Sequence, residues 1–274
     1  MKVAVLVLAH KNLEQLELLV SSLTSDFDVY IHIDKKWNIP LEALNDKYKN
    51  AFFFSEYGIV WGGSNIMKAT ISLFETAIEK SYNYYILISG QDLPLLSNKQ
   101  IIHKLKGLNG ASLVRYRGAD RKELNRMFYY WENDTNNKLL KHIIRLTRNL
   151  QRITGIKRTL FPLRRYYKHS MWFTLHHDAV RYVLDFLHQH PDFIDKMKFT
   201  TLIDEIWLGS ILLNSSEKII NGESSFVNWT TGPEYPRTLR MVDYEGVKKQ
   251  DCLFARKFDM NVDKEVIYKF LNNR

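Results

Sequence analysis

The chain has 274 residues, of which 45% are hydrophobic and 13% aromatic, and this composition excludes a disordered protein and suits one domain with a substantial core. No stretch approaches 18 consecutive apolar residues and the only cysteine is Cys252, so we expect a soluble or peripherally membrane-attached protein of the reducing cytoplasm. The formal net charge of +9 favours anionic partners: phosphates, nucleotide sugars, nucleic acid or an anionic membrane surface.

The first half of the chain alternates strand and helix patterns. Continuous apolar runs predict strands at Val3–Leu8, Val29–Ile33, Phe52–Phe54 and Tyr84–Ile88. Apolar residues at helical spacing predict helices at Leu13–Leu23, Ile66–Ser81 and Asn98–Leu108. This order is typical of an α/β domain with a mostly parallel central sheet flanked by helices.

Three of the predicted strands end in polar residues. These ends are His10-Lys11, Asp34-Lys35-Lys36 and Gln91-Asp92. Open α/β sheets bind ligands at the carboxyl ends of their strands, so the pattern indicates a nucleotide-type site. Glycine fingerprints of dinucleotide-binding and P-loop proteins are absent, which disfavours both classes. Asp92 either contacts a ligand or caps the turn that follows its strand.

A basic segment lies in the middle of the chain. No acidic residue occurs between Asp134 and Asp178, and apolar residues at helical spacing predict a basic helix over residues 138–154 that stops at Gly155. Such a helix either contacts an anionic membrane, through Lys141–Arg152, or a phosphate-bearing acceptor, or it packs on the core with a solvated basic face. No recognised nucleic-acid module surrounds it, so we expect no nucleic-acid partner.

The last third of the chain adds further candidates. Its patterns predict a strand at Ser170–Leu175 and helices at Asp178–Leu187 and Ile206–Leu213. Asp204 and Glu205 precede the second helix and either complement its dipole or supply a general base, with Glu205 raised in pKa by its apolar neighbours. The tail carries cations that either reach a diphosphate or are solvated: Arg237, Arg240, Arg256 and Lys257.

Taken together, these segments resemble the core-2/I-branching glycosyltransferase family, family 14, over residue 5 to about residue 263. The motifs that carry the resemblance are VLAHK, YIHIDKK, VWGGSNIMKATISL, YYILISGQDLPLLSN, SMWFTL, IDEIWLGSILLNS and LFARKFDMNVD. The resemblance implies one GT-A-like domain over residues 1–274. Residues 1–115 would be its nucleotide-sugar-binding half, and residues 116–274 its acceptor and catalytic half.

The resemblance also implies residue roles. Glu205 matches the catalytic base, and Asp92 matches a signature aspartate that we expect to hold a sugar hydroxyl between donor and acceptor. Lys257 and Arg237, with Arg240 as a rival, match the cations that neutralise the diphosphate, so neither a metal nor another cofactor is expected. The remaining assignments are Asp34, Val7, His10 and Trp61 to the donor, and Trp172 and Asp204 to the acceptor.

The expected function is therefore inverting transfer of a sugar from a UDP-sugar donor to a hydroxyl of a glycan or lipid-linked glycan. N-acetylglucosamine is the first expectation for the sugar, with xylose or another hexose as the alternative. The expected setting is bacterial surface or capsular polysaccharide synthesis at the inner face of the membrane. A non-catalytic protein that binds nucleotide sugars or nucleic acid is the competing class.

Overall fold

The computed structural model of the chain describes residues 1–232 and 235–273 and is built around one seven-stranded sheet. The strand order is β10-β6-β9-β4-β1-β2-β3. Neighbouring strands are parallel except at β9, which runs antiparallel to both β4 and β6. The bounds are β1 Val3–Ala9, β2 Asp28–Ile33, β3 Ala51–Phe54, β4 Tyr84–Ser89, β6 Ser112–Val114, β9 Thr174–His176 and β10 Ile219–Asn221. The predicted α/β class with a mostly parallel sheet is confirmed.

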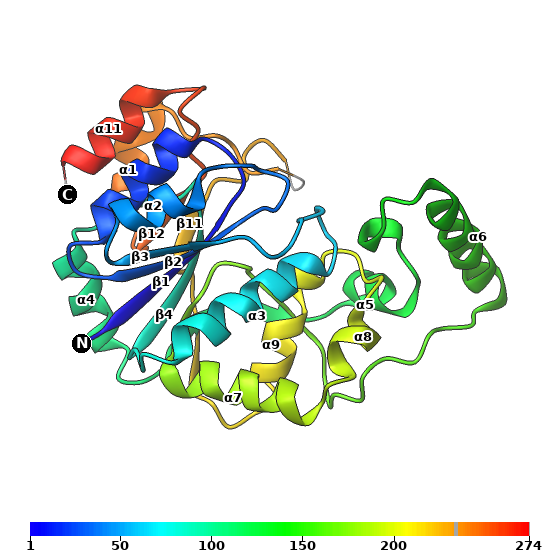
Figure 1. Cartoon of the computed structure of the whole chain (residues 1–274). Coiled ribbons are helices and arrows are strands. Elements are labelled where there is room, and N and C mark those ends of the chain that lie inside the picture. The colour runs from blue at the N-terminus through cyan, green and yellow to red at the C-terminus, as the bar shows by residue number, and fades with distance from the viewer. Residues whose placement is uncertain (233–234, 274) are drawn as a thin grey trace.

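Helices cover both faces of this sheet, as Figure 1 shows. Val3, Val5 and Val7 of β1 point to one face and pack with α1 and α4, whereas Leu6 and Leu8 point to the other face, with α3, α7 and α9. The helices with eight or more residues are α1 Leu13–Leu23, α3 Asn65–Ile78, α4 Asn98–Gly107, α5 Arg121–Phe128, α6 Lys138–Thr154, α7 His177–Gln189 and α11 Lys264–Asn272. The shorter ones are α2 Leu41–Lys47, α8 Phe193–Met197, α9 Trp207–Leu212, α10 Tyr244–Lys248, and the 3-10 turns η1 Glu132–Asp134, η2 Ile203–Glu205 and η3 Met241–Asp243.

The chain also forms two smaller sheets. One has the order β11-β12-β5 and packs on a separate apolar cluster with α10 and α11, and the other pairs β7 with β8. Their bounds are β5 Leu93–Pro94, β7 Tyr116–Gly118, β8 Tyr167–His169, β11 Ser225–Val227 and β12 Phe254–Arg256. The antiparallel pairing of β12 with β5 brings the chain's C-terminal part beside Asp92.

The structure corrects one predicted strand. Residues 170–173 are not extended within a sheet, because the Ser170 hydroxyl accepts a hydrogen bond from the Trp172 backbone N–H at 3.2 Å and turns the chain there. Two short strands, β8 and β9, flank this turn instead. No helix in the described ranges is long and apolar enough to cross a membrane.

Candidate active site

The polar residues that follow β1, β2 and β4 meet at one edge of the sheet, as predicted. The Asp34 N–H donates to the Ala9 carbonyl at 2.8 Å, and the Gly90 N–H donates to the Leu8 carbonyl at 2.9 Å. A Cβ at Gly90 would lie 3.1 Å from the Ala9 Cβ, so glycine allows the chain that leaves β4 to pass close to β1. His10 is exposed at this edge.

Asp34 organises the loop that follows β3. Its Oδ1 accepts hydrogen bonds from the backbone N–H groups of Lys36 at 3.0 Å and Ile59 at 3.2 Å, and Lys36 Nζ lies 3.5 Å from Oδ2. The residue is 7% exposed. Asp34 therefore shapes the rim of the expected donor site, and its predicted contact with a nucleoside stays a prediction.

Asp92 is completely buried and holds a cation that the sequence analysis did not place at its side. Its Oδ1 accepts from the Ser89 hydroxyl at 2.6 Å and lies 3.3 Å from Arg256 Nε. The Arg256 guanidinium in turn lies over the Trp172 ring, 3.9 Å from its centroid. Burial raises the pKa of Asp92, and Arg256 opposes this rise. Since Asp92 has no exposed surface, this arrangement supports Arg256 and Trp172 and offers no direct contact with a sugar.

Cations gather where β1 and β12 end. Burial lowers the pKa of Lys257, and the positive charges of Lys11 and Arg256 lower it further. Lys11 is balanced by Asp259, with Nζ 2.6 Å from Oδ2. An anion bound here would relieve this crowding of positive charge, so the cluster is suited to phosphate.

The tail brings two further arginines to this cluster. The Leu239 N–H donates to the Lys257 carbonyl at 2.9 Å, which aligns the 237–240 segment with Lys257. Asp243 contacts both rival arginines, pairing with the Arg237 guanidinium at 3.3 Å and accepting from the Arg240 N–H at 2.9 Å. In the described part of the chain, no group of three or more His, Cys, Asp or Glu side chains could hold a metal ion.

Glu205 ends η2 and is held by two cations. Its Oε2 contacts Arg126 Nη1 of α5 at 3.0 Å and Lys168 Nζ of β8 at 3.2 Å. The carboxylate makes no other hydrogen bond or ion pair within residues 1–232 and 235–273, so Oε1 has no protein partner there, and the side chain is 28% exposed. A fixed carboxylate with one accessible oxygen can accept a proton from a bound hydroxyl. The apolar surroundings expected for Glu205 are replaced by these cations, because Ile206 and Trp207 turn into the core.

The sequence suggested a raised pKa for Glu205, whereas the structure shows one for its neighbour Asp204. Burial raises the pKa of Asp204 to about 7, and the neighbouring charge of Glu205 contributes to the rise. Its Oδ1 is buried and accepts no hydrogen bond within the described residues. The predicted acceptor contact of Asp204 stays a prediction.

This raised pKa predicts how stability depends on pH. The folded state favours protonated Asp204, so the stabilisation from this proton is present at acidic pH and is lost as the pH rises from about 4 to about 7. We expect Asp204→Asn, which mimics the protonated form, to raise Tm relative to the wild type, and to raise it more at about pH 8 than at about pH 5. Thermal unfolding of both proteins at the two pH values measures this difference. The same change in Tm at both would contradict it.

The segment from Lys168 to Trp172 connects the side chains around Glu205 with the cations around Arg256. Its first residue contacts Glu205, and its last covers Arg256. Four steps of extended chain span at most roughly 14 Å. Glu205 and its partners therefore lie in the same region of the molecule as the cations around Arg256.

The turn η1 fixes the neighbourhood of Glu205 through its last two side chains. Asn133 Nδ2 donates to the Trp61 carbonyl at 3.0 Å, and Asp134 accepts from the N–H groups of Ser64 and Phe199. The Leu202 N–H donates to the Gly62 carbonyl at 2.9 Å, which links the same loop to η2. Trp61 itself is 62% exposed, and its ring centroid lies 6.3 Å from that of Tyr235. Trp61 therefore stands at the rim beside η2.

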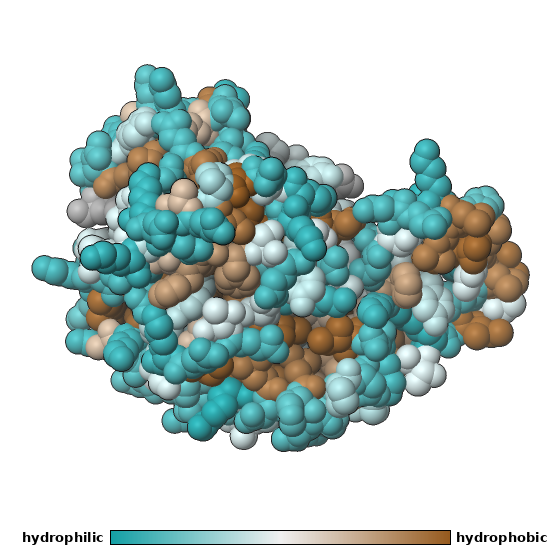
Figure 2. All heavy atoms as spheres, viewed as in Figure 1, coloured by the Kyte–Doolittle hydropathy of each residue, from teal (hydrophilic) through white to brown (hydrophobic). Residues whose placement is uncertain are grey.

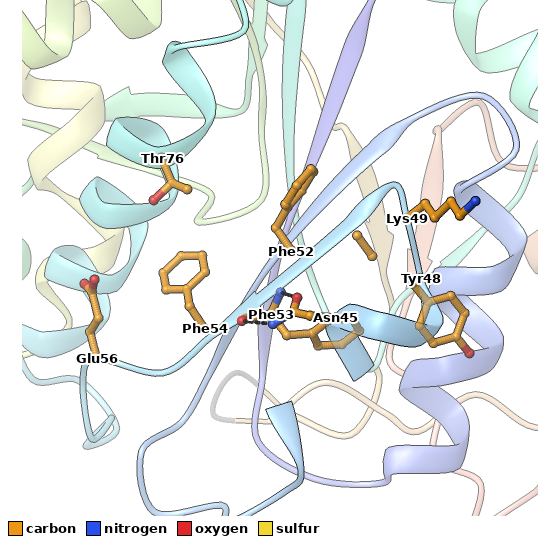
Figure 3. Close-up of a pocket in the computed structure, with 9 residues that line it drawn as sticks. Asn45, Tyr48, Lys49, Phe52, Phe53, Phe54, Glu56 and Thr76 are labelled. Atoms are coloured by element: carbon orange, nitrogen blue, oxygen red, sulfur yellow. Dashed lines mark hydrogen bonds between the residues drawn. The ribbon is translucent and has the colours of Figure 1, made fainter. Parts of the chain in front are cut away.

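Two features lie apart from this region. Val7 is fully buried in the core beneath α1, so its side chain has no surface on which a uracil could pack. The pocket in Figure 3 runs along the edge strand β3, with Phe52, Phe54 and Glu56 on its walls, and none of the predicted site residues lines it. We place the site by its side-chain chemistry, because the β3 pocket lacks a comparable group of ionised residues.

The comparison with protein families identifies the family of the chain. The sequence model of the Core-2/I-Branching enzyme family matches residues 3–252. The chain belongs to this family. The motifs that carried the resemblance lie on β1, β2, β4, β9 and β12, on the loops beside these strands, and on α3, η2 and α9. Sequence reasoning missed Arg126 and Lys168, for which no local signal existed, and the roles of Arg256, which its position next to Lys257 in β12 could have suggested.

Several curated proteins resemble the chain at low identity. The N-acetyllactosaminide beta-1,6-N-acetylglucosaminyl-transferase of Mus musculus is 29% identical over 119 residues, covering 40% of this chain and 30% of that protein. Xylosyltransferase 1 of Rattus norvegicus is 23% identical over 278 residues, covering 88% and 31%. The chain thus spans about a third of the length of these relatives. Among solved structures, S. aureus TarS 1-349 in complex with UDP-GlcNAc aligns with a TM-score of 0.40 at 13% identity, covering 81% of this chain and 57% of that one.

Proposed function

We propose that this chain is an inverting, GT-A-like glycosyltransferase that moves a sugar from a UDP-sugar to a hydroxyl of a glycan. The observation that carries the proposal is the state of Glu205, whose Oε2 is fixed by Arg126 and Lys168 while Oε1 stays open. Lys257, crowded by the positive charges of Lys11 and Arg256 in the same region, offers a complementary charge for a diphosphate. A protein that only binds nucleotide sugars has no need of such a carboxylate.

In the proposed reaction, Glu205 Oε1 takes the proton of the acceptor hydroxyl as its oxygen bonds to the anomeric carbon of the donor. The bond from that carbon to the diphosphate breaks, and UDP leaves with the electron pair. One carboxylate on the acceptor side suffices for this single displacement, whereas retention uses a second, closely placed nucleophile.

The leaving diphosphate gains negative charge, and fixed cations stabilise it in the transition state. Lys257 would act as a point charge, and Arg237, positioned by Asp243, could bind phosphate oxygens with its planar guanidinium. These two cations would take the place of a divalent metal. N-acetylglucosamine and xylose, the sugars in the names of the relatives, are the preferred donor candidates. We assign the acceptor to surface or capsular polysaccharide made by a bacterium.

Hydrolysis and binding assays on the purified chain test this function. We expect slow hydrolysis of UDP-GlcNAc or UDP-xylose in preference to UDP-glucose and UDP-galactose, thermal stabilisation by UDP, and unchanged activity in excess EDTA. Loss of activity in EDTA that Mn²⁺ or Mg²⁺ restores would refute the metal-free mechanism. UDP stabilisation without hydrolysis or transfer would favour a nucleotide-sugar-binding protein, and stabilisation by nucleic acid alone would favour the other alternative.

A further inference from the structure

The helix α6 turns its apolar side to solvent. We define its apolar stripe as the five side chains Leu139, Ile143, Leu146, Leu150 and Ile153, which are 48–83% exposed. Figure 1 shows α6 standing away from the body of the molecule, and Figure 2 shows hydrophobic side chains gathered on its outer surface. A contiguous exposed apolar stripe of this kind marks an interaction surface.

The opposite side of α6 is the one that attaches to the protein. Ile144 and Gln151 are buried there, and Gln151 Oε1 accepts from the Tyr130 N–H at 3.1 Å. Arg145 and Arg148 both pair with Glu132 of η1, and the Arg148 guanidinium lies 4.4 Å from the centroid of the Trp131 ring. The predicted alternative that the apolar side of the helix packs on the core is therefore wrong, since the stripe is exposed and the contacts with η1 are ionic.

The charge around the stripe selects its partner. Residues 135–177 contain no aspartate or glutamate, and exposed Lys138 and Arg152 flank the stripe on α6. A second copy docked stripe to stripe would bring such basic flanks together without a carboxylate on either helix. An anionic bilayer instead offers a hydrocarbon boundary to the stripe and phosphate groups to its basic flank.

Two threonines next to the stripe, Thr147 and Thr154, are also suited to an apolar environment. Thr147 and Thr154 donate their hydroxyls to the carbonyls of Ile143 and Leu150, at 3.0 and 2.9 Å. These hydroxyls are satisfied within the helix, so they need no water. We propose that α6 lies in the surface of an anionic lipid bilayer, with its apolar stripe inserted and its basic flank on the lipid phosphates.

The position of α6 also indicates the class of acceptor, an inference that rests on the proposed function. Glu132 of η1 holds α6, while the next two residues of η1 hold the Trp61 loop and the segment before η2. A bilayer bound by α6 would therefore lie beside the site that contains Glu205. The acceptor class that fits this position is a glycan carried on a membrane lipid.

Vesicle co-sedimentation of the full chain tests the docking surface without requiring catalysis. We expect binding to vesicles of phosphatidylcholine with phosphatidylglycerol, weaker binding to phosphatidylcholine alone, and weaker binding at high salt. Leu146→Gln/Leu150→Gln should lower binding at least about tenfold, and Lys138→Gln should lower it less. Arg145 and Arg148 are not changed, because their loss would detach the helix.

A matched control replaces exposed apolar residues outside α6. Val242→Gln/Ile220→Gln should leave vesicle binding unchanged, since these side chains are 81% and 44% exposed in other parts of the molecule. Circular dichroism and UDP-sugar hydrolysis at the wild-type level show that the α6 variant is folded, and separate failure of the docking surface from failure of the proposed function. No binding by the wild type, unchanged binding of the α6 variant, equal binding to neutral vesicles, or a wild-type dimer that the α6 substitutions dissociate would overturn the proposal.

Discussion

Replacing Glu205 by glutamine is expected to lower the rate of sugar transfer about 10²-fold or more, which is the usual scale for loss of a general base. Glutamine keeps the size of the side chain and can still accept a hydrogen bond from Arg126 or Lys168, but it cannot take the acceptor proton. Donor affinity should be largely kept, because Glu205 lies on the acceptor side of the proposed reaction. Steady-state transfer rates and the Kd for UDP measure the two effects separately.

Glu223→Gln is the matched control for this experiment. Glu223 is also a carboxylate beside an arginine, but it is 52% exposed and lies 3.9 Å from Arg115 at the surface. Its variant should transfer sugar at the wild-type rate. Near-normal turnover of Glu205→Gln would remove Glu205 from the role of base and would leave its two cations without a catalytic explanation.

Removing Arg256 is expected to destabilise the fold strongly. Arg256→Met would leave the Asp92 carboxylate buried and unpaired, and breaking a buried ion pair in this way costs about 3 kcal/mol or more of the free energy of unfolding. Asp92→Asn/Arg256→Met should recover much of this loss, because it removes the stranded charge as well. Urea unfolding of the single and double variants measures both quantities.

The exposed pair of Arg115 and Glu223 again supplies the comparison, since Arg115→Met should change the free energy of unfolding little. If Arg256→Met unfolds at the same urea concentration as the wild type, then the Asp92 pair does not contribute to stability as we argue. A stable Arg256→Met protein with impaired transfer would place Arg256 at the substrate, next to Trp172, and would reduce its structural part.

The sequence predicted those parts of the fold that local patterns determine. The buried strands β1, β2 and β4 show as continuous apolar runs. The helix α6 was predicted over its full length from apolar residues at helical spacing and from Gly155, which ends it with a φ of 73°. The structure adds Asn137, whose side chain caps the first turn. The strands of two or three residues carry too few side chains to show alternation, and the antiparallel direction of β9 is set by its neighbours in the sheet.

The candidate site was predictable only where a motif carried it. Glu205 and Lys257 came from motifs, whereas Arg126 and Lys168 reach Glu205 from α5 and β8, far from it in the sequence. Burial was also invisible in the sequence, so Asp92 was expected to face a ligand although its partner is Arg256. The orientation of α6 could not be predicted, because its attachment depends on Glu132 and Trp131, which lie outside the helix.

The turn η1 has a consequence for the size of the acceptor. Its three consecutive residues hold α6, the Trp61 loop and the segment that leads to Glu205, so direct contacts of one turn tie the proposed lipid-binding helix to the proposed catalytic base. On a bilayer, Glu205 would stand at one fixed height above the lipid phosphates. The enzyme would then select the hydroxyl to be glycosylated by its distance from the lipid, and a chain that had grown past that height would no longer be a substrate.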